Sequence, residues 1–210
     1  MAVKNIQAVC LSMEACVRNV ERAAQTRDRL TAAARALFAD QGFAATSTEA
    51  VIARSGMTRG ALYHHFAEKA ELFEAVCREL SLEAKAAIEL AVKGIEDPLT
   101  GLEAGSLAWV DYMLAPEARR ILLVEAPTVL GWQRWRRLDE KHSFQLLRAG
   151  IGEAMAAGAV HFEAGAEALA ILLNGAMNAL VLQLGPGASA LDIAAGRDAV
   201  RHLLQAFASR

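Results

Sequence analysis

The segment from Thr58 to Lys69 carries the densest set of side chains that could bind a nucleic acid. It offers a hydroxyl, a guanidinium, a phenol, an imidazole and an ammonium group, which bind phosphates and base edges. Gly60 and Ala61 are small, so a helix that begins at Thr58 could approach the floor of a groove closely. We therefore predict a DNA-contacting surface. Its candidate residues are Thr46, Ser47, Arg54, Thr58, Arg59, Gly60, Ala61, Tyr63, His64 and Lys69.

Two short helices joined by a tight turn would position this surface. Thr46 and Glu49 have the spacing of a capping box, which predicts the start of the first helix. Gly56 permits the left-handed conformation that the turn needs. Thr58 is expected to cap the second helix, whose Leu62 and Phe66 fall on one buried side. In a helix-turn-helix, the second helix lies in the major groove.

The run from residue 26 to residue 83, and MTRGALYHHFAEKAELF above all, resembles the DNA-binding domain of the TetR (tetracycline repressor) family. Ala61 stands where family members often have Thr or Ser, so it offers no side-chain hydrogen bond to a base. The resemblance implies a dimeric transcriptional regulator that binds a palindromic double-stranded DNA operator. It also implies a C-terminal helical domain for ligand binding and dimerisation, and a repressor that an inducer releases.

Composition favours an all-α protein. The chain has 210 residues, of which 54% are apolar and only 6% aromatic, with four prolines. This suits a helical core rich in alanine and leucine. The three cysteines, Cys10, Cys16 and Cys77, show no metal-ligand spacing, and their odd number suits a reducing cytoplasm. We expect a cytoplasmic protein with no metal and no cofactor.

The charge balance gives no general support for DNA binding. The formal net charge is −2, and residues 26–84 hold seven Lys or Arg against eight Asp or Glu. Binding therefore requires local positive charge at the contact surface. Arg54, Arg59 and Lys69 surround the second helix and could supply it. Lys69, near a helix N-terminus, is expected to contact a phosphate.

Three domains are predicted: an N-terminal extension over 1–24, the DNA-binding domain over 25–84, and a sensing and dimerisation domain over 85–210. Ile6, Val9 and Met13 belong to an apolar series with helical spacing, so the extension is expected to form a helix. Three interpretations remain open. The extension packs on the DNA-binding domain or a partner subunit, it is an arm that touches DNA, or translation starts at Met13.

Glycine and proline mark the remaining helices. The first helix should run from Thr26 to Gly42, and a long one from Lys69 to Gly94. Asp97-Pro98 predicts another start. Pro116 opens a short helix that Pro127 breaks, and a single long helix is expected over 131–157. Ser189 and Asp192 should cap the last helix.

The stretch over 166–184 is apolar on nearly every side, which raises the question of a membrane span. Asn174, Asn178 and Gln183 interrupt it and argue against one. A helix of this kind must be covered on all sides. The family resemblance implies that it pairs with the last helix, and with the same two helices of a second subunit, in a homodimer.

The resemblance assigns the central helices to sensing a small hydrophobic or amphipathic effector, and the long helix from Lys69 couples the two domains. Aromatic and polar side chains here could line an apolar pocket with a few fixing groups. The candidates are Trp109, Tyr112, Met113, Trp132, Asn174, Met177 and Asn178.

Two other classes of function make different demands on the sequence. An all-helical enzyme would need convergent catalytic groups, yet there is no HExxH motif, nucleophile elbow or phosphate-binding glycine loop, and His142 and His161 stand alone. We expect no enzyme. The better alternative is a helix-turn-helix protein controlled by a protein partner or by no ligand.

Overall fold

The computed structural model describes the backbone of residues 2–185 and 187–209, and the side chains of these ranges from residue 20 onward. Apart from one isolated bridge between Val160 and Ala208, the regular structure in these ranges is helical, which confirms the predicted all-α class. The elements are α1 Ala2–Ala45, α2 Thr48–Ser55, α3 Arg59–His65, α4 Lys69–Val92, α5 Pro98–Leu114, α6 Pro116–Ala118, the π-helix η1 Arg119–Glu125, α7 Ala126–Leu130, α8 Trp132–Glu140, α9 Ser143–Ala156, α10 Gly165–Leu184 and α11 Ala190–Gln205.

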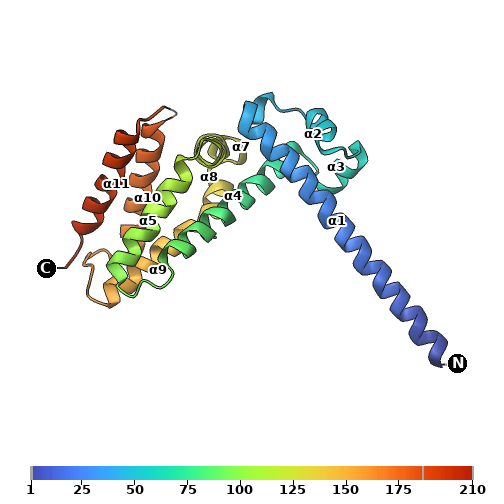
Figure 1. The fold of residues 1–210 in the computed structure, drawn as a ribbon, viewed down its shortest axis with the longest axis horizontal. Coiled ribbons are helices and arrows are strands. Elements are labelled where there is room, and N and C mark those ends of the chain that lie inside the picture. Colours follow the sequence, from blue (N-terminus) through green and yellow to red (C-terminus); the bar gives the residue numbers. More distant parts are fainter. Residues whose placement is uncertain (1, 186, 210) are drawn as a thin grey trace. The chain divides into compact units, whose positions relative to one another are not determined.

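The helices form two compact units, one ending at Val76 and the other beginning at Cys77. In the first unit, α2 and α3 pack against the C-terminal half of α1 (Figure 1). Phe38 and Phe73 meet edge to face with ring centroids 5.1 Å apart, and Phe43 contacts both. This aromatic cluster joins α1 to the first turns of α4, so the unit has a core of its own.

Helix α1 extends the predicted first helix to Ala2. The backbone of residues 2–24 is helical and continues directly into it, so this range is part of α1 and does not form a separate helix. Gly42, with φ 84° and ψ 171°, leaves the helical conformation where the end of that helix was predicted. The apolar series from Ile6 to Val17 lies outside the described side chains, and Val20 at its end is exposed.

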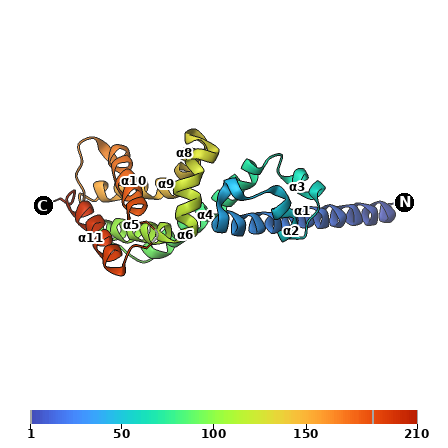
Figure 2. The same ribbon diagram turned by 90° about the horizontal axis from the view of Figure 1, so that it is seen from above.

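In the second unit, α5 packs against α9, α10 and α11 (Figure 2). Its core contains Trp109 and Val110 of α5, Ile151 of α9 and Leu173 of α10, all nearly inaccessible to solvent. The predicted cap of α11 is confirmed, because Ser189 and Asp192 form a reciprocal capping box. Helices α5, α9 and α10, together with α4, line the cavity described below.

The prediction that Pro127 breaks its helix was wrong. The chain widens into η1, where the Ala126 N–H bonds to the Ile121 carbonyl, and continues into α7. Pro127 thus falls in the first turn of α7, where its missing N–H costs little. The helix ends instead at Gly131, which has φ 76°.

The single long helix predicted over 131–157 is also wrong, because α8 ends at Glu140 and α9 begins at Ser143. Leu138 and Phe144 are six residues apart, which would place them on different sides of one continuous helix. The non-helical conformation of His142, φ −125° and ψ −93°, allows both side chains to be buried.

Helix α10 is covered on one side only by its own chain. Leu169, Leu173 and Val181 are buried, whereas Ile171 and Leu172 are exposed. Among the described residues, α10 is the one helix long and apolar enough to cross a membrane by length and composition. The prediction that α10 is buried on every side is therefore not met by the contacts within one chain.

Candidate nucleic-acid interface and internal cavity

The first helix of the predicted helix-turn-helix is capped by Ser47, not by Thr46. The Ser47 Oγ accepts the Ala50 N–H at 3.0 Å. Thr46 is buried, and its hydroxyl donates to the Gly42 carbonyl at 2.7 Å. Because Gly42 turns the chain, Thr46 is drawn inward and the cap falls one residue later. The predicted capping box of Thr46 with Glu49 was therefore wrong. The Thr46 hydroxyl instead stabilises the segment between Gly42 and α2.

The turn between the two helices follows the prediction. Gly56 adopts φ 66°, and its N–H bonds to the Ile52 carbonyl at 3.1 Å. Arg29 of α1 donates to the Ser55 carbonyl at 3.0 Å, which tethers the end of α2. The Thr58 hydroxyl accepts the Ala61 N–H at 3.2 Å and caps α3 as expected.

Helix α3 presents one hydrogen-bonding side to solvent. Arg59 has 73% of its side chain exposed, Tyr63 is 42% exposed, and His64 is exposed beside them. The Arg59 guanidinium lies 5.5 Å from the centre of the Tyr63 ring and 3.9 Å from the Glu49 carboxylate. At Gly60, the nearest atom to an added Cβ would be 4.0 Å away, so this end of the helix has open space.

The opposite side of α3 is anchored in the core. Leu62 and Phe66 are about 1% exposed, as their spacing predicted. Arg27 of α1 lies over the Phe66 ring at 4.4 Å and donates to the His65 carbonyl at 3.3 Å. Burial, with the neighbouring His64 and Arg27, lowers the pKa of His65. The helix is therefore held rigidly, which suits a surface that must match a groove.

Lys69 supports this unit from within. Its Nζ donates to the carbonyls of Phe43 and Thr46, both at 2.8 Å, and lies 4.2 Å from the centre of the Phe43 ring. An ammonium group has three donors, so two are committed to the loop before α2. Of the other predicted contacts, Arg54 and Ser47 are exposed on α2 and its cap. Sequence reasoning missed the internal role of Lys69, since the acceptors are backbone carbonyls 23 and 26 residues away.

The second unit encloses a cavity of about 300 Å³ among α4, α5, α9 and α10. Three predicted residues, Trp109, Asn174 and Met177, line it. Sequence reasoning missed most of the wall, including Ile88, Val92, Leu102, Leu146, Gly105 and Gly150. The glycines were the available signal, since side chains there would occupy space inside the helix bundle.

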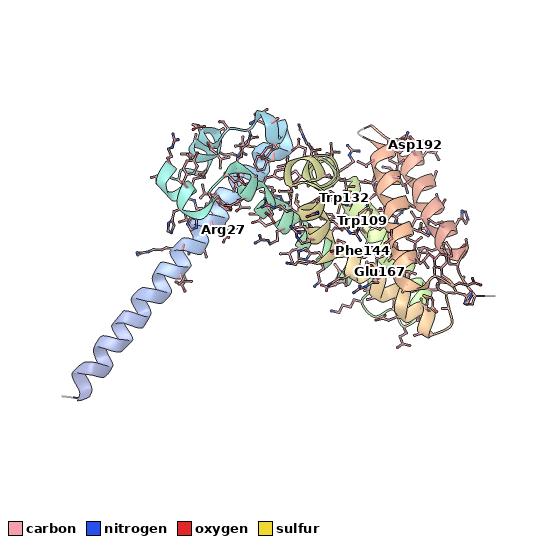
Figure 3. All side chains as sticks on the ribbon, turned by 180° about the vertical axis from the view of Figure 1, so that it is seen from behind. Arg27, Trp109, Trp132, Phe144, Glu167 and Asp192 are labelled. Carbon is pink, nitrogen blue, oxygen red and sulfur yellow. The ribbon has the colours of Figure 1, made fainter. Side chains whose placement is uncertain are left out.

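Four predicted cavity residues lie elsewhere. Tyr112 donates its hydroxyl to the Glu83 carboxylate at 2.8 Å and does not line the cavity. Trp132 is 62% exposed and packs on Trp135, on a different helix from Trp109 (Figure 3). Met113 and Asn178 line a separate cavity of about 20 Å³. Amphipathic spacing places aromatic residues near a core but does not say which void they face.

Asp139 connects the two cavities. It lines the smaller one and accepts a hydrogen bond at 3.3 Å from Asn174, which lines the larger one. Burial raises the pKa of Asp139 to about 6, although the hydrogen bond from Asn174 acts in the opposite direction. Among the described residues, no group of three or more His, Cys, Asp or Glu is placed to hold a metal ion.

Comparison with known proteins covers both units. A family model described as "Bacterial regulatory proteins, tetR family" matches residues 30–76. A second, "Tetracyclin repressor-like, C-terminal domain", matches residues 99–207, which is about half of the chain.

Individual relatives agree with these matches. The HTH-type transcriptional regulator AcrR of Shigella flexneri is 33% identical over 105 residues, covering 49% of this chain and 48% of AcrR. The chain thus spans about half the length of this relative. A regulator structure from Pectobacterium atrosepticum has 29% identity and a TM-score of 0.75, covering 90% of this chain and 97% of that one. RolR in complex with resorcinol, at 15% identity and a TM-score of 0.67, shares the fold over 88% of this chain and 89% of its own.

Proposed function

Because the chain belongs to the TetR family of bacterial regulatory proteins, it is a DNA-binding transcriptional regulator, and we propose that it is a dimeric repressor that a small molecule releases from a palindromic operator. The observation that carries the proposal is the exposed hydrogen-bonding side of α3, anchored from behind by Leu62 and Phe66. The family consists of regulators rather than enzymes. The protein acts in the cytoplasm, where its DNA is.

Roles within the interface follow from position on α3. Arg59 lies in the first turn, which enters the groove first, and its forked guanidinium suits a base edge. Tyr63 and His64, one turn further on, reach phosphates. Gly60 and Ala61 are small residues, so the surface of α3 at these positions can come close to the floor of the groove. Ser47, Arg54 and the third N–H donor of Lys69 contact the DNA phosphate backbone on either side of the groove that α3 enters.

Dimerisation would use α10 and α11. Ile171, Leu172 and Leu182 of α10 are 45–58% exposed, and Leu191 of α11 is 78% exposed. Exposed apolar area of this kind marks an interaction surface. The exposed Gly175 and Ala176 permit close approach of a second α10. A two-fold dimer then reads two half-sites about 34 Å apart, or a multiple of that.

Ligand response rests on the cavity of about 300 Å³, which is within the size range of small-molecule sites. It is large enough to favour a small hydrophobic or amphipathic effector over regulation by a protein partner or without a ligand. Ile88 and Val92 line it and lie near the end of α4, the helix that Lys69 opens. An effector that prefers the non-binding conformation weakens operator affinity by its differential binding energy, typically about 1–3 kcal/mol.

The test is DNA binding by the full chain. Fluorescence anisotropy with duplexes from the region upstream of its own gene, over a salt series, should show selective and salt-sensitive binding to a palindrome. Tyr63→Phe removes one phosphate hydrogen bond and should weaken binding about three- to tenfold across sequences. Tyr112→Phe, which changes the other tyrosine of the chain, is the matched control. Equal affinities of these two variants would contradict the interface.

A further inference from the structure

The cavity of the second unit has an apolar interior. Ile88 and Val92 of α4, Leu102 of α5 and Leu146 of α9 face it, together with Met177 of α10. Its volume of about 300 Å³ corresponds to about ten water molecules at liquid density. An apolar space of this size is better filled by an organic group than by water.

Gly150 keeps part of this space open. It lies inside α9, where glycine is less stable than alanine. An added Cβ would lie 3.6 Å from the Leu102 Cδ1, an ordinary contact, so no clash within the bundle requires glycine there. A larger side chain at this position would instead occupy the cavity.

Two polar groups in the wall have no partner within the described part of the chain. The Ser106 hydroxyl and the Trp109 indole nitrogen are buried and make no hydrogen bond, and both residues line the cavity. A buried polar group without a partner is destabilising. Both atoms are closed to a water-sized probe, so they lie within the packed wall and do not face the open space of the cavity.

The charged residues of the lining all have one sign. Glu89, Glu96, Asp97 and Glu153 are acidic, and the described residues that line the cavity include no Lys, Arg or His. All four are exposed, so they lie at the solvent side of the cavity. Four carboxylates without a basic residue beside them in the lining favour cations and disfavour anions at the entrance.

Two of these carboxylates already have structural roles. Asp97 caps α5 by accepting the Thr100 N–H at 2.8 Å, and Glu89 lies 3.6 Å from the Lys85 ammonium. Glu96 and Glu153 come from different elements, the loop before α5 and helix α9, and are the best placed to bind an incoming charge.

We propose, resting on the proposed role of this cavity as the effector site, that the effector is an organic cation. Its apolar body occupies the space beside Leu102 and Gly150, and its ammonium group lies between Glu96 and Glu153. Because both carboxylates are exposed, each contributes modestly, and together they raise affinity about fivefold or more over a neutral analogue.

The experiment compares three probes with one skeleton by isothermal titration calorimetry on the full chain: phenylbutylamine, phenylbutanol and phenylbutanoate. At neutral pH they are cationic, neutral and anionic. We expect affinity to fall in that order, and the advantage of the amine to shrink as salt is added, because exposed charges are screened.

Two variants locate the effect. The double substitution Glu96→Gln with Glu153→Gln should remove the preference for the amine and leave the alcohol unchanged. Glu163→Gln, at an exposed position outside the cavity, is the charge-matched control and should change neither. Gly150→Leu should weaken all three probes at least tenfold by filling the cavity, with its folding checked by circular dichroism.

The outcomes separate this inference from the proposed function. If the alcohol or the acid binds as tightly as the amine, or if no probe binds, the cationic effector is refuted. If Gly150→Leu folds and binds the amine normally, the cavity is not the site and the inference also fails. Operator binding is measured without any probe. A failure of the amine to bind selectively therefore does not contradict DNA binding, and a failure to bind the operator does not contradict the cationic effector.

Discussion

Replacing Asp139 with Asn tests how a buried carboxyl affects the second unit. The folded protein holds the pKa of Asp139 at about 6, against an ordinary value of 3.8, chiefly through burial. The folded state therefore binds its proton more tightly than the unfolded state does. Below the unfolded pKa the carboxyl is protonated in both states and does not lower the free energy of unfolding. As the pH rises from there through about 6, the carboxyl progressively lowers the free energy of unfolding.

The magnitude follows from the two pKa values. The difference of about two units corresponds to about 3 kcal/mol at a pH above both values. Since the unfolded carboxyl is already partly ionised near pH 4.5, about 2 kcal/mol of this develops between about pH 4.5 and pH 8. Asn keeps a carbonyl to accept the Asn174 N–H but never ionises. The stability of Asp139→Asn relative to wild type should therefore rise by about 2 kcal/mol over this range.

Urea denaturation followed by tryptophan fluorescence measures this difference. All three tryptophans, Trp109, Trp132 and Trp135, lie in the same unit as Asp139, so the signal reports the unfolding of that unit. Glu163→Gln, which also exchanges a carboxyl for an amide but at an exposed position of the same unit, is the control. Its stability relative to wild type should stay constant within about 0.5 kcal/mol.

The reasoning would be refuted by a stability difference between Asp139→Asn and wild type that does not change with pH, or that falls as the pH rises. The first result would mean that the carboxyl is solvated in the folded state. The second would mean that its charged form is stabilised there, for example by a cation close to Asp139.

Three further predictions concern the interface, the loop and the dimer. Arg59→Ala should weaken operator binding by about 1–3 kcal/mol and relax selectivity at one base pair, measured by anisotropy against operator variants; unchanged selectivity would exclude base reading. Lys69→Met should lower the unfolding free energy by about 2–4 kcal/mol in circular dichroism, because two loop carbonyls lose a charged donor, and wild-type stability would contradict that role. Ala176→Glu should give monomers in light scattering while Ala156→Glu, at an exposed site on α9, stays dimeric; a dimeric Ala176→Glu protein would rule out the α10 surface.

Local chemistry allowed much of the first unit to be predicted from sequence. The Thr58 cap, the left-handed Gly56 and the burial of Leu62 and Phe66 depend on neighbours within a few residues, and all are present. The cap at Ser47 was missed by one residue, because the choice between two adjacent hydroxyls depended on Gly42 drawing Thr46 inward.

Contacts distant in sequence were decided only by the tertiary structure. Lys69 was predicted to bind phosphate from its place at a helix start, yet its ammonium group meets carbonyls more than 20 residues away. Trp132 and Tyr112 are residue types that often line binding sites, but both lie outside the cavity. Gly150, which has no side chain to bind a ligand, forms part of its wall. A repeating pattern determines which side of a helix is apolar. A cavity remains where the apolar sides of several helices do not pack fully against one another. Its position depends on the volumes of side chains from four separate helices, which no single helix pattern specifies.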